Sequence, residues 1–294
     1  FINLNDAGYK YYSYYLRKIS KEYKKVYLLS LSGGGDADMI NFYHADGRKI
    51  SRSAKSDEFV GNQLSDIADT VGANIIIPFS SFHQYQRSDS VWAQEHTVPE
   101  NYYKKGIRKN HEFIDPFSEI DCVNNNVSNL KPSKNNVTIK DPGSFGDSWS
   151  DQLDLDEIKE LEEYFLEKKL LYSTVGFVNF IVGKKEHRID FKNNIKCGVT
   201  FEVPRNSLLL AIRYKIFDDL LIGNFMKTTL HNMQNLYEKR FNYIITKWSD
   251  NGGVNNKNEY DDYLDHYQLK AGREFLYHNF LDQSKNLFLR FFAK

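Results

Sequence analysis

Asp6 and His83 each follow an apolar run that indicates a buried strand. Residues 1–5 lead into Asp6, and residues 73–78 lead through a short polar stretch to His83. In open α/β sheets, binding sites lie beyond the carboxyl ends of the strands. A carboxylate or an imidazole held there on a rigid scaffold could act as a metal ligand or as a general base.

Both residues also have a purely structural interpretation. A helical pattern begins directly after Asp6, and aspartate is a good N-cap because its carboxylate accepts from the first unpaired backbone N–H groups. The capping role and the ligand role of Asp6 can both hold. His83 is singled out by its position after a strand. The other histidines are interpreted as ordinary surface or core residues: His44, His96, His111, His187, His231, His266 and His278.

Arg87 and Asp89 continue the polar stretch that contains His83. The planar guanidinium of an arginine matches the carboxylate or phosphate of a substrate. Arg87 and Asp89 are therefore predicted to bind substrate. The alternative is that the two side chains form a local ion pair with each other.

A run of three glycines, Gly33–Gly35, follows the strand predicted over residues 26–31. The backbone amides of such a loop can cradle an anion. However, the spacing does not fit the dinucleotide-binding fingerprint, and no Gly-Lys-Ser/Thr follows. The sequence favours a plain tight loop near a site.

The predicted elements of the first part alternate between strands and helices. Apolar residues recur at helical spacing over residues 9–23 and 59–71, and a predicted strand follows each helix, over residues 26–31 and 73–78. A charged turn at residues 45–48 indicates a hairpin or loop. This order of elements predicts an α/β fold.

The pattern weakens between about residues 100 and 150, which are polar and irregular. Beyond them we expect a helix capped by Asp154 or Asp156, three strands, and further helices. The predicted strands and helices are, in order, strands 176–182, 187–191 and 199–203 and helices 207–217, 237–248 and 260–292.

Three regions follow from this pattern: residues 1–110, an irregular connection over residues 111–150, and an α+β region over residues 151–294 that ends in long helices. The last predicted helix is rich in Tyr and Phe. Such a face is more typical of core packing or of an oligomer contact than of a cofactor site. Its Lys and Arg residues are interpreted as a solvated face.

The amino-acid composition of the chain bears on whether it binds nucleic acid or membranes. The 39 Lys and Arg residues balance 39 Asp and Glu residues, so the overall charge does not support binding to nucleic acid. Cys122 and Cys197 are the only cysteines, and no apolar run approaches the roughly 20 residues of a membrane helix. We therefore expect a cytoplasmic chain that binds neither nucleic acid nor membranes.

Five short segments stand in a characteristic order along the chain: Ile2-Asn-Leu-Asn-Asp6, Ser32-Gly-Gly-Gly35, Ile75-Ile-Ile-Pro-Phe79, Gly146-Asp-Ser-Trp149 and Leu220-Leu-Ile-Gly223. Together they resemble the metallo-β-lactamase superfamily, and more narrowly the branch that includes CMP-N-acetylneuraminate hydroxylase and its bacterial relatives. The resemblance implies a four-layer αββα fold with metals at strand ends. It also implies that Asp6 contacts the metal centre and that His83 is the nearest candidate for a second ligand.

The principal ligand motif of that superfamily, His-x-His-x-Asp-His, does not occur in these residues. It normally precedes the segment that ends at Asp6, and this chain opens with Phe1 inside a predicted strand. We therefore expect the chain to be the later portion of a longer protein, or a processed or partial sequence. Asp6 and His83 alone cannot assemble a normal dinuclear site.

The resemblance implies a bound metal, Zn or Fe. With Zn, the protein would be a metal-dependent hydrolase, in which the metal activates water to attack an ester, amide or phosphoester. One alternative is an iron-dependent oxygenase similar to CMP-sialic acid hydroxylase, which would need an electron-supplying domain. Another is a non-catalytic binding or assembly subunit whose aromatic C-terminal helices make the contacts. A small-molecule or nucleotide-sugar-like substrate fits the two enzymes, and a homo-oligomer fits the assembly subunit.

Overall fold

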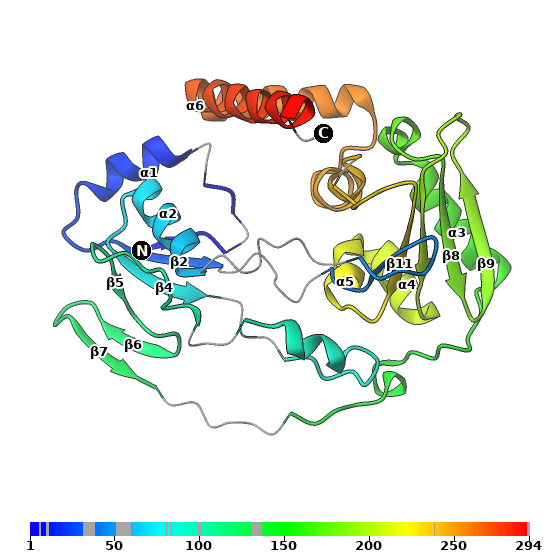
Figure 1. Ribbon diagram of the computed structural model, residues 1–294, viewed down its shortest axis with the longest axis horizontal. Coiled ribbons are helices and arrows are strands. Elements are labelled where there is room, and N and C mark those ends of the chain that lie inside the picture. The colour runs from blue at the N-terminus through cyan, green and yellow to red at the C-terminus, as the bar shows by residue number, and fades with distance from the viewer. Residues whose placement is uncertain are drawn as a thin grey trace.

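The computed structural model of the chain contains two main β-sheets with helices packed on them (Figure 1). The residues that the structure describes are 1–5, 7–9, 12–31, 39–50, 60–79, 82, 84–98, 102–130, 137–237 and 239–292. The four-stranded sheet lies on the left of Figure 1 and the five-stranded sheet on the right. Helices flank a parallel sheet, which confirms the mixed α/β class that the sequence predicted.

The four-stranded sheet is parallel throughout, in the order β1-β2-β4-β5. Its strands are β1 (Ile2–Asn3), β2 (Tyr27–Leu31), β4 (Ile75–Phe79) and β5 (Glu112–Phe113). The interior strands β2 and β4 are almost wholly apolar. This composition is expected where both faces of a parallel sheet are covered.

Two helices belong to this sheet. Helices α1 (Ser13–Ser20) and α2 (Val60–Val71) contact each other, and α2 also contacts β4. Leu64 of α2 and Leu28 of β2 are fully buried in the layer between helix and sheet. The apolar stripe of α2 therefore provides the core on this face of the sheet.

Residues 102–130 cover part of the opposite face. They contain β5 and an antiparallel hairpin of β6 (Ser118–Asp121) and β7 (Asn126–Asn129). Ile120 of β6 packs against the buried side chains of Tyr27 and Ile75. The sequence predicted an irregular connection in this region because the two hairpin strands are short and polar and β7 is wholly exposed.

The five-stranded sheet has the order β3-β11-β10-β8-β9. Its strands are β3 (Phe42–His44), β8 (Phe177–Val182), β9 (Lys185–Asp190), β10 (Gly198–Glu202) and β11 (Lys227–His231). The pairs β8–β10 and β3–β11 are parallel, and the other two pairs are antiparallel. Because β3 comes from the first part of the chain, the blue segment beside β11 in Figure 1 ties that part to the second sheet. The sequence predicted neither β3 nor β11.

One face of the five-stranded sheet is covered by helices, namely α3 (Leu155–Leu166), α4 (Arg205–Tyr214), α5 (Phe217–Ile222) and the π-helix η7 (Tyr243–Asp250). Aromatic rings from helices and strands meet in the core: Phe165, Phe180, Phe201, Phe217 and Phe241. Asp154 caps α3 in a capping box, which confirms one of the two predicted caps.

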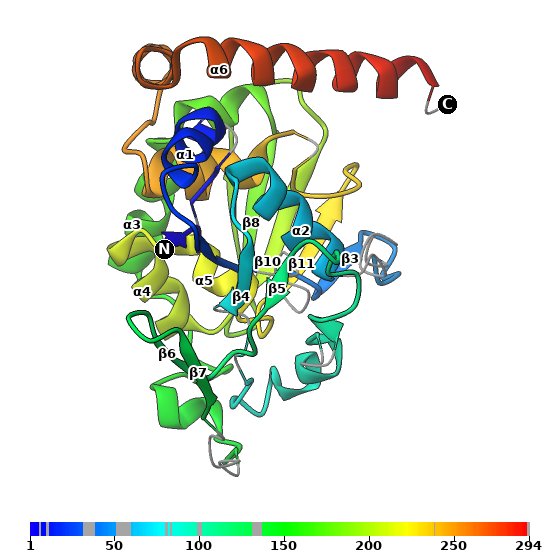
Figure 2. The ribbon, with the colours of Figure 1, turned by 90° about the vertical axis from the view of Figure 1, so that its left-hand side faces the viewer.

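Short 3-10 helices and one long helix make up the rest of the helical structure that is described. The short ones are η3 (Val91–His96), η5 (Pro142–Phe145) and η6 (Lys169–Ser173). Helix α6 (Lys257–Phe292) is interrupted at Gly272, which has a φ of 53°. Figure 2 shows one part of α6 end-on and the other lengthwise, above the rest of the molecule. A positive φ suits glycine, so Gly272 marks the bend.

Candidate functional site

Three parallel strands end at one edge of the four-stranded sheet. In the register of the sheet, Leu31 at the end of β2 lies beside Phe79 at the end of β4. The backbone N–H of Leu4 donates to the carbonyl of Leu29 at 2.8 Å, so β1 stays paired with β2 one residue beyond its assigned end. The strands that lead to the predicted ligands are therefore neighbours, and their carboxyl ends share one edge.

Asp6, His83 and the glycine run Gly33–Gly35 lie outside the described residues. Within the described part of the chain, no group of three or more His, Cys, Asp or Glu side chains is placed to hold a metal ion. Asp6 and His83 stay predictions.

The segments that follow β2 and β4 both reach the unit built on the five-stranded sheet. The backbone N–H of Ile40 donates to Oδ1 of Asn224 at 2.9 Å. Nδ2 of Asn224 donates to the hydroxyl of Tyr85 at 3.0 Å, and that hydroxyl donates to the carbonyl of Ile222 at 3.1 Å. Asn224 is fully buried. One asparagine therefore holds the segment that follows β2 and the segment that follows β4.

Arg87 and Asp89 form the ion pair that the sequence offered as the alternative to substrate binding. Nε and Nη2 of Arg87 donate to the two carboxylate oxygens of Asp89 at 3.0 and 2.9 Å. Nη1 of Arg87 donates to Asp147 at 2.6 Å, and Cζ lies 4.0 Å from the centre of the Phe225 ring. The Arg87 side chain is only 12% exposed. The substrate-binding role of Arg87 and Asp89 stays a prediction.

The two carboxylates around Arg87 have further donors. Nε1 of Trp149 donates to Asp89 at 3.0 Å, and the backbone N–H of Ser207 donates to Asp147 at 2.8 Å. Burial by itself raises the pKa of Asp89, but the hydrogen bonds from Arg87 and Trp149 outweigh it and hold that pKa below its ordinary value. The cluster is thus an ionised network that joins the segment after β4 to α4.

We expect Asp89 to contribute to stability in a pH-dependent way. Its pKa is lower in the folded chain than the 3.8 of the unfolded chain, so the unfolded state binds more protons between these two values. The contribution is therefore complete above pH 3.8 and is lost as the pH falls through the folded pKa. Denaturant unfolding of the wild type and of Asp89→Asn over a pH series measures it. The difference between the two proteins should shrink in acid, and a difference that does not change with pH would contradict the assignment.

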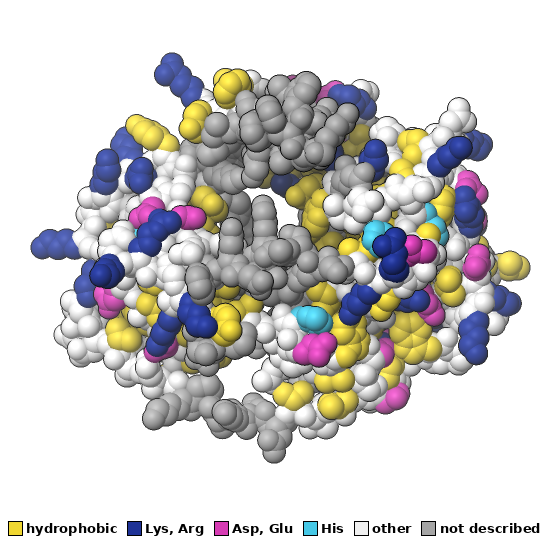
Figure 3. Space-filling view, in the orientation of Figure 1, with side chains coloured by type: hydrophobic (Ala, Val, Ile, Leu, Met, Phe, Trp, Pro, Cys, Tyr) yellow, Lys and Arg dark blue, Asp and Glu magenta, His cyan; other side chains and the backbone are white. Residues whose placement is uncertain are grey.

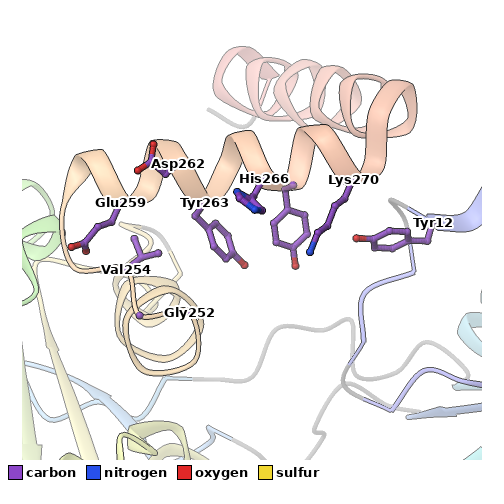
Figure 4. A pocket seen from close by; sticks show the side chains of 10 residues that line it. Tyr12, Gly252, Val254, Glu259, Asp262, Tyr263, His266 and Lys270 are labelled. Atoms are coloured by element: carbon purple, nitrogen blue, oxygen red, sulfur yellow. The ribbon is translucent and has the colours of Figure 1, made fainter.

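A cavity of about 500 Å³ lies between the first part of α6, the turn that follows η7, and Tyr12 at the start of α1. Figure 4 shows Tyr263 and Lys270 pointing down from the helix, with Tyr12 facing Lys270 from the other side. Burial and a hydrogen bond with Tyr267 raise the pKa of Tyr263, so its phenol is neutral at pH 7. Aromatic rings and the ammonium group of Lys270 line this cavity together with the imidazole of His266 and the carboxylates of Glu259 and Asp262.

Charged side chains of both signs are interspersed on the face shown in Figure 3. This distribution agrees with the equal numbers of basic and acidic residues in the sequence. Over the described ranges, no helix is both long and apolar enough to cross a membrane.

Asn224 and Asp147 were not predicted as important residues, although both lie in or beside segments that the sequence singled out. Asp147 is part of Gly146-Asp-Ser-Trp149, and Asn224 directly follows Leu220-Leu-Ile-Gly223. The sequence signal that pointed to them was the resemblance of these two segments to the metallo-β-lactamase superfamily. The contacts of the two side chains could be identified only in the three-dimensional structure. Asp147 lies 60 residues from its partner Arg87, and Asn224 lies 139 residues from its partner Tyr85.

Comparisons with known proteins match no family model, no curated protein and no solved structure to this chain. A function is therefore inferred from the arrangement of the chain's own residues.

Proposed function

We propose that the chain is part of a metal-dependent hydrolase with the metallo-β-lactamase fold, with Asp6 and His83 as metal ligands. The observation that supports this proposal is the common edge at which β1, β2 and β4 end. Asp6 and His83 follow two of these strands, so the sheet delivers both chain segments to the same side. A metal bound there would lower the pKa of a water molecule and supply a hydroxide for attack on an ester, amide or phosphoester.

In this proposal the substrate is a small molecule that resembles a nucleotide sugar. The cavity beneath α6 supports this class of substrate through the ring surfaces of Tyr12 and Tyr263 and the positive charge of Lys270, which lie beside the carboxylates of Glu259 and Asp262. Bases stack on aromatic side chains, and a lysine ammonium pairs with phosphate.

The identity of the metal separates the hydrolase from its closest alternative. A carboxylate and an imidazole suit zinc and iron equally well. Iron at the same ligands would favour an oxygenase over a hydrolase. One sample of the purified chain is equilibrated with Zn²⁺ and another with Fe²⁺ under nitrogen, and the bound metal is then measured in each. Retention of zinc favours the hydrolase, and retention of iron favours the oxygenase.

We expect Asp6→Ala to lower the affinity of the chain for its metal by at least about tenfold, since it removes one of the two proposed ligands. The measurement is the metal content after dialysis, together with a titration of Zn²⁺ against a coloured chelator. Asp46→Ala is the matched control, because Asp46 is an exposed aspartate that pairs with Arg48 in a turn. No bound metal in either the wild type or Asp6→Ala would contradict the enzyme proposal for this chain.

A second candidate function is that of a non-catalytic assembly subunit, and helix α6 favours it. Large apolar side chains on this helix face solvent, among them Leu269, which is 82% exposed, and Phe280, which is 67% exposed. Exposed apolar side chains on one helix are typical of a contact surface. A metal-free chain that sediments as an oligomer would support this function and contradict the hydrolase.

A further inference from the structure

The surface of α1 and of the turn that follows it is basic and aromatic. Five Lys or Arg side chains and a single acidic one, Glu22, lie within residues 12–25, and all six are exposed. The basic residues are Arg17, Lys18, Lys21, Lys24 and Lys25. Two ring side chains of the same surface also face solvent, because Tyr15 is 61% exposed and Tyr23 is 63% exposed. We call this surface the basic face.

The first part of α6 carries the opposite charge. Residues 258–266 contain no Lys or Arg, and their four acidic side chains are all exposed: Glu259, Asp261, Asp262 and Asp265. Asp262, Asp265 and Leu269 are spaced by three and four residues, so they lie on the same side of the helix. Leu269 is 82% exposed. We call this side of α6 the acidic face.

The central charges of the two faces are available to a partner. Within the part of the chain that the structure describes, no ion pair is formed by Lys18 or Lys21 on the basic face, nor by Asp262 or Asp265 on the acidic face. Asp261 differs from these two aspartates, because it pairs with Lys257 on the same helix. Surfaces that carry aromatic rings and an excess of one charge suit a partner of the opposite charge.

The two faces lie close together at one end of the molecule. Figures 1 and 2 both show α1 and α6 at the upper end, and Tyr12 and Lys270 line one cavity between the two helices. A surface with a basic patch beside an acidic patch is complementary to a copy of itself. A two-fold rotation places the basic face of each copy on the acidic face of the other, so both contacts form at once.

We propose that the chain forms a two-fold symmetric dimer in which α1 of each copy packs on α6 of the other. Lys18 and Lys21 then lie opposite the acidic face of the second copy. The dimer also removes Leu269 and the exposed rings of α1 from water, which favours association. This proposal goes beyond the proposed function and does not depend on it, because neither face contains a proposed metal ligand.

The test exchanges the charges of the two faces in the whole chain. Lys18→Glu/Lys21→Glu makes the basic face acidic, and Asp262→Lys/Asp265→Lys makes the acidic face basic. Either variant alone places like charges opposite each other, so we expect dimerisation to weaken by about 100-fold. A mixture of the two variants pairs opposite charges again and should form a heterodimer about as tightly as the wild type dimerises. Analytical ultracentrifugation of the wild type, of each variant and of the mixture measures these affinities.

The apolar part of the interface is tested by Leu269→Ser, which we expect to weaken dimerisation by about tenfold. Leu155→Ser is the matched control, because Leu155 at the start of α3 is 86% exposed and lies outside both faces. It should leave the affinity unchanged.

A wild type that stays monomeric, or a mixture of the charge variants that does not associate, would overturn the proposal. The same samples are titrated with a single-stranded thymidine oligonucleotide. A monomeric wild type that binds this oligonucleotide, with binding lost in Lys18→Glu/Lys21→Glu, would assign the basic face to a nucleic acid and would likewise overturn the dimer.

Discussion

Replacing Asp250 by alanine is expected to lower the free energy of unfolding by about 3–5 kcal/mol. The Asp250 side chain lies at the end of η7 and is only 1% exposed. Its carboxylate accepts from the hydroxyl of Tyr164 at 2.7 Å and from the backbone N–H of Phe217 at 3.2 Å. The ammonium group of Lys168, which is 0% exposed, lies 3.5 Å away. Without Asp250, this ammonium group loses its buried counter-charge.

The direction of the two pKa shifts shows why this loss is costly. Burial raises the pKa of Asp250 and lowers the pKa of Lys168, so desolvation opposes both charges and their mutual attraction offsets only part of it. In Asp250→Ala, the folded chain binds the Lys168 proton more weakly than the unfolded chain. Stability should therefore rise with pH between the folded pKa of Lys168 and its ordinary value of 10.5.

Denaturant unfolding of the wild type, Asp250→Ala and the double variant Lys168→Met/Asp250→Leu measures this effect. The double variant should be closer in stability to the wild type than Asp250→Ala is, because it leaves no unpaired buried charge. A loss of less than about 1 kcal/mol in Asp250→Ala would show that neighbouring groups, such as Glu167 at 3.4 Å from Lys168, already compensate the charge.

The parallel sheet and its helices could be predicted because local sequence specifies them. Strand β4 is an apolar run, and α2 carries apolar residues at helical spacing. The predicted boundaries of both elements lie within two residues of those in the structure. Asp154 could be recognised as a helix cap because the capping box is a local pattern.

Strands β3 and β11 could not be predicted, because they depend on each other across most of the chain. Phe42 pairs with Thr228 and His44 pairs with Leu230, about 186 residues later. β3 has three residues, and in β11 Thr228 and Leu230 are buried while Lys227 is exposed. Neither stretch is long or apolar enough to indicate a strand alone. Tertiary pairing decides the conformation here.

In the candidate site, side-chain partners that are far apart in sequence were likewise not predictable. The sequence supported two interpretations of Arg87, because Asp89 is two residues away and visible as a partner. It did not reveal that Asp147 would complete the pairing from a position 60 residues later. A second carboxylate changes the chemistry of an arginine, since a guanidinium that already donates to two carboxylates has fewer N–H groups left for a substrate.

Asn224→Ala is expected to lower the free energy of unfolding by about 3–5 kcal/mol, for two separable reasons. The first is the loss of hydrogen bonds: the buried N–H of Ile40 loses its acceptor, and the hydroxyl of Tyr85 loses its donor. The second is the backbone, because Asn224 has a φ of 56°, in the left-handed region that asparagine tolerates better than alanine does.

Asn224→Gly separates these two reasons. Glycine also removes the hydrogen bonds, but it adopts a positive φ without a steric penalty. We therefore expect Asn224→Gly to be more stable than Asn224→Ala by about 1 kcal/mol and still clearly less stable than the wild type. Denaturant unfolding of the wild type, Asn224→Ala and Asn224→Gly measures both differences in stability. If the glycine variant matched the wild type, the side-chain bonds of Asn224 would contribute nothing to stability, and if it matched the alanine variant, the left-handed backbone would carry no strain. Ile40 and Tyr85 belong to different segments. A large difference in stability between the wild type and Asn224→Gly would therefore also show that the second unit stabilises both segments at the carboxyl edge of the first sheet.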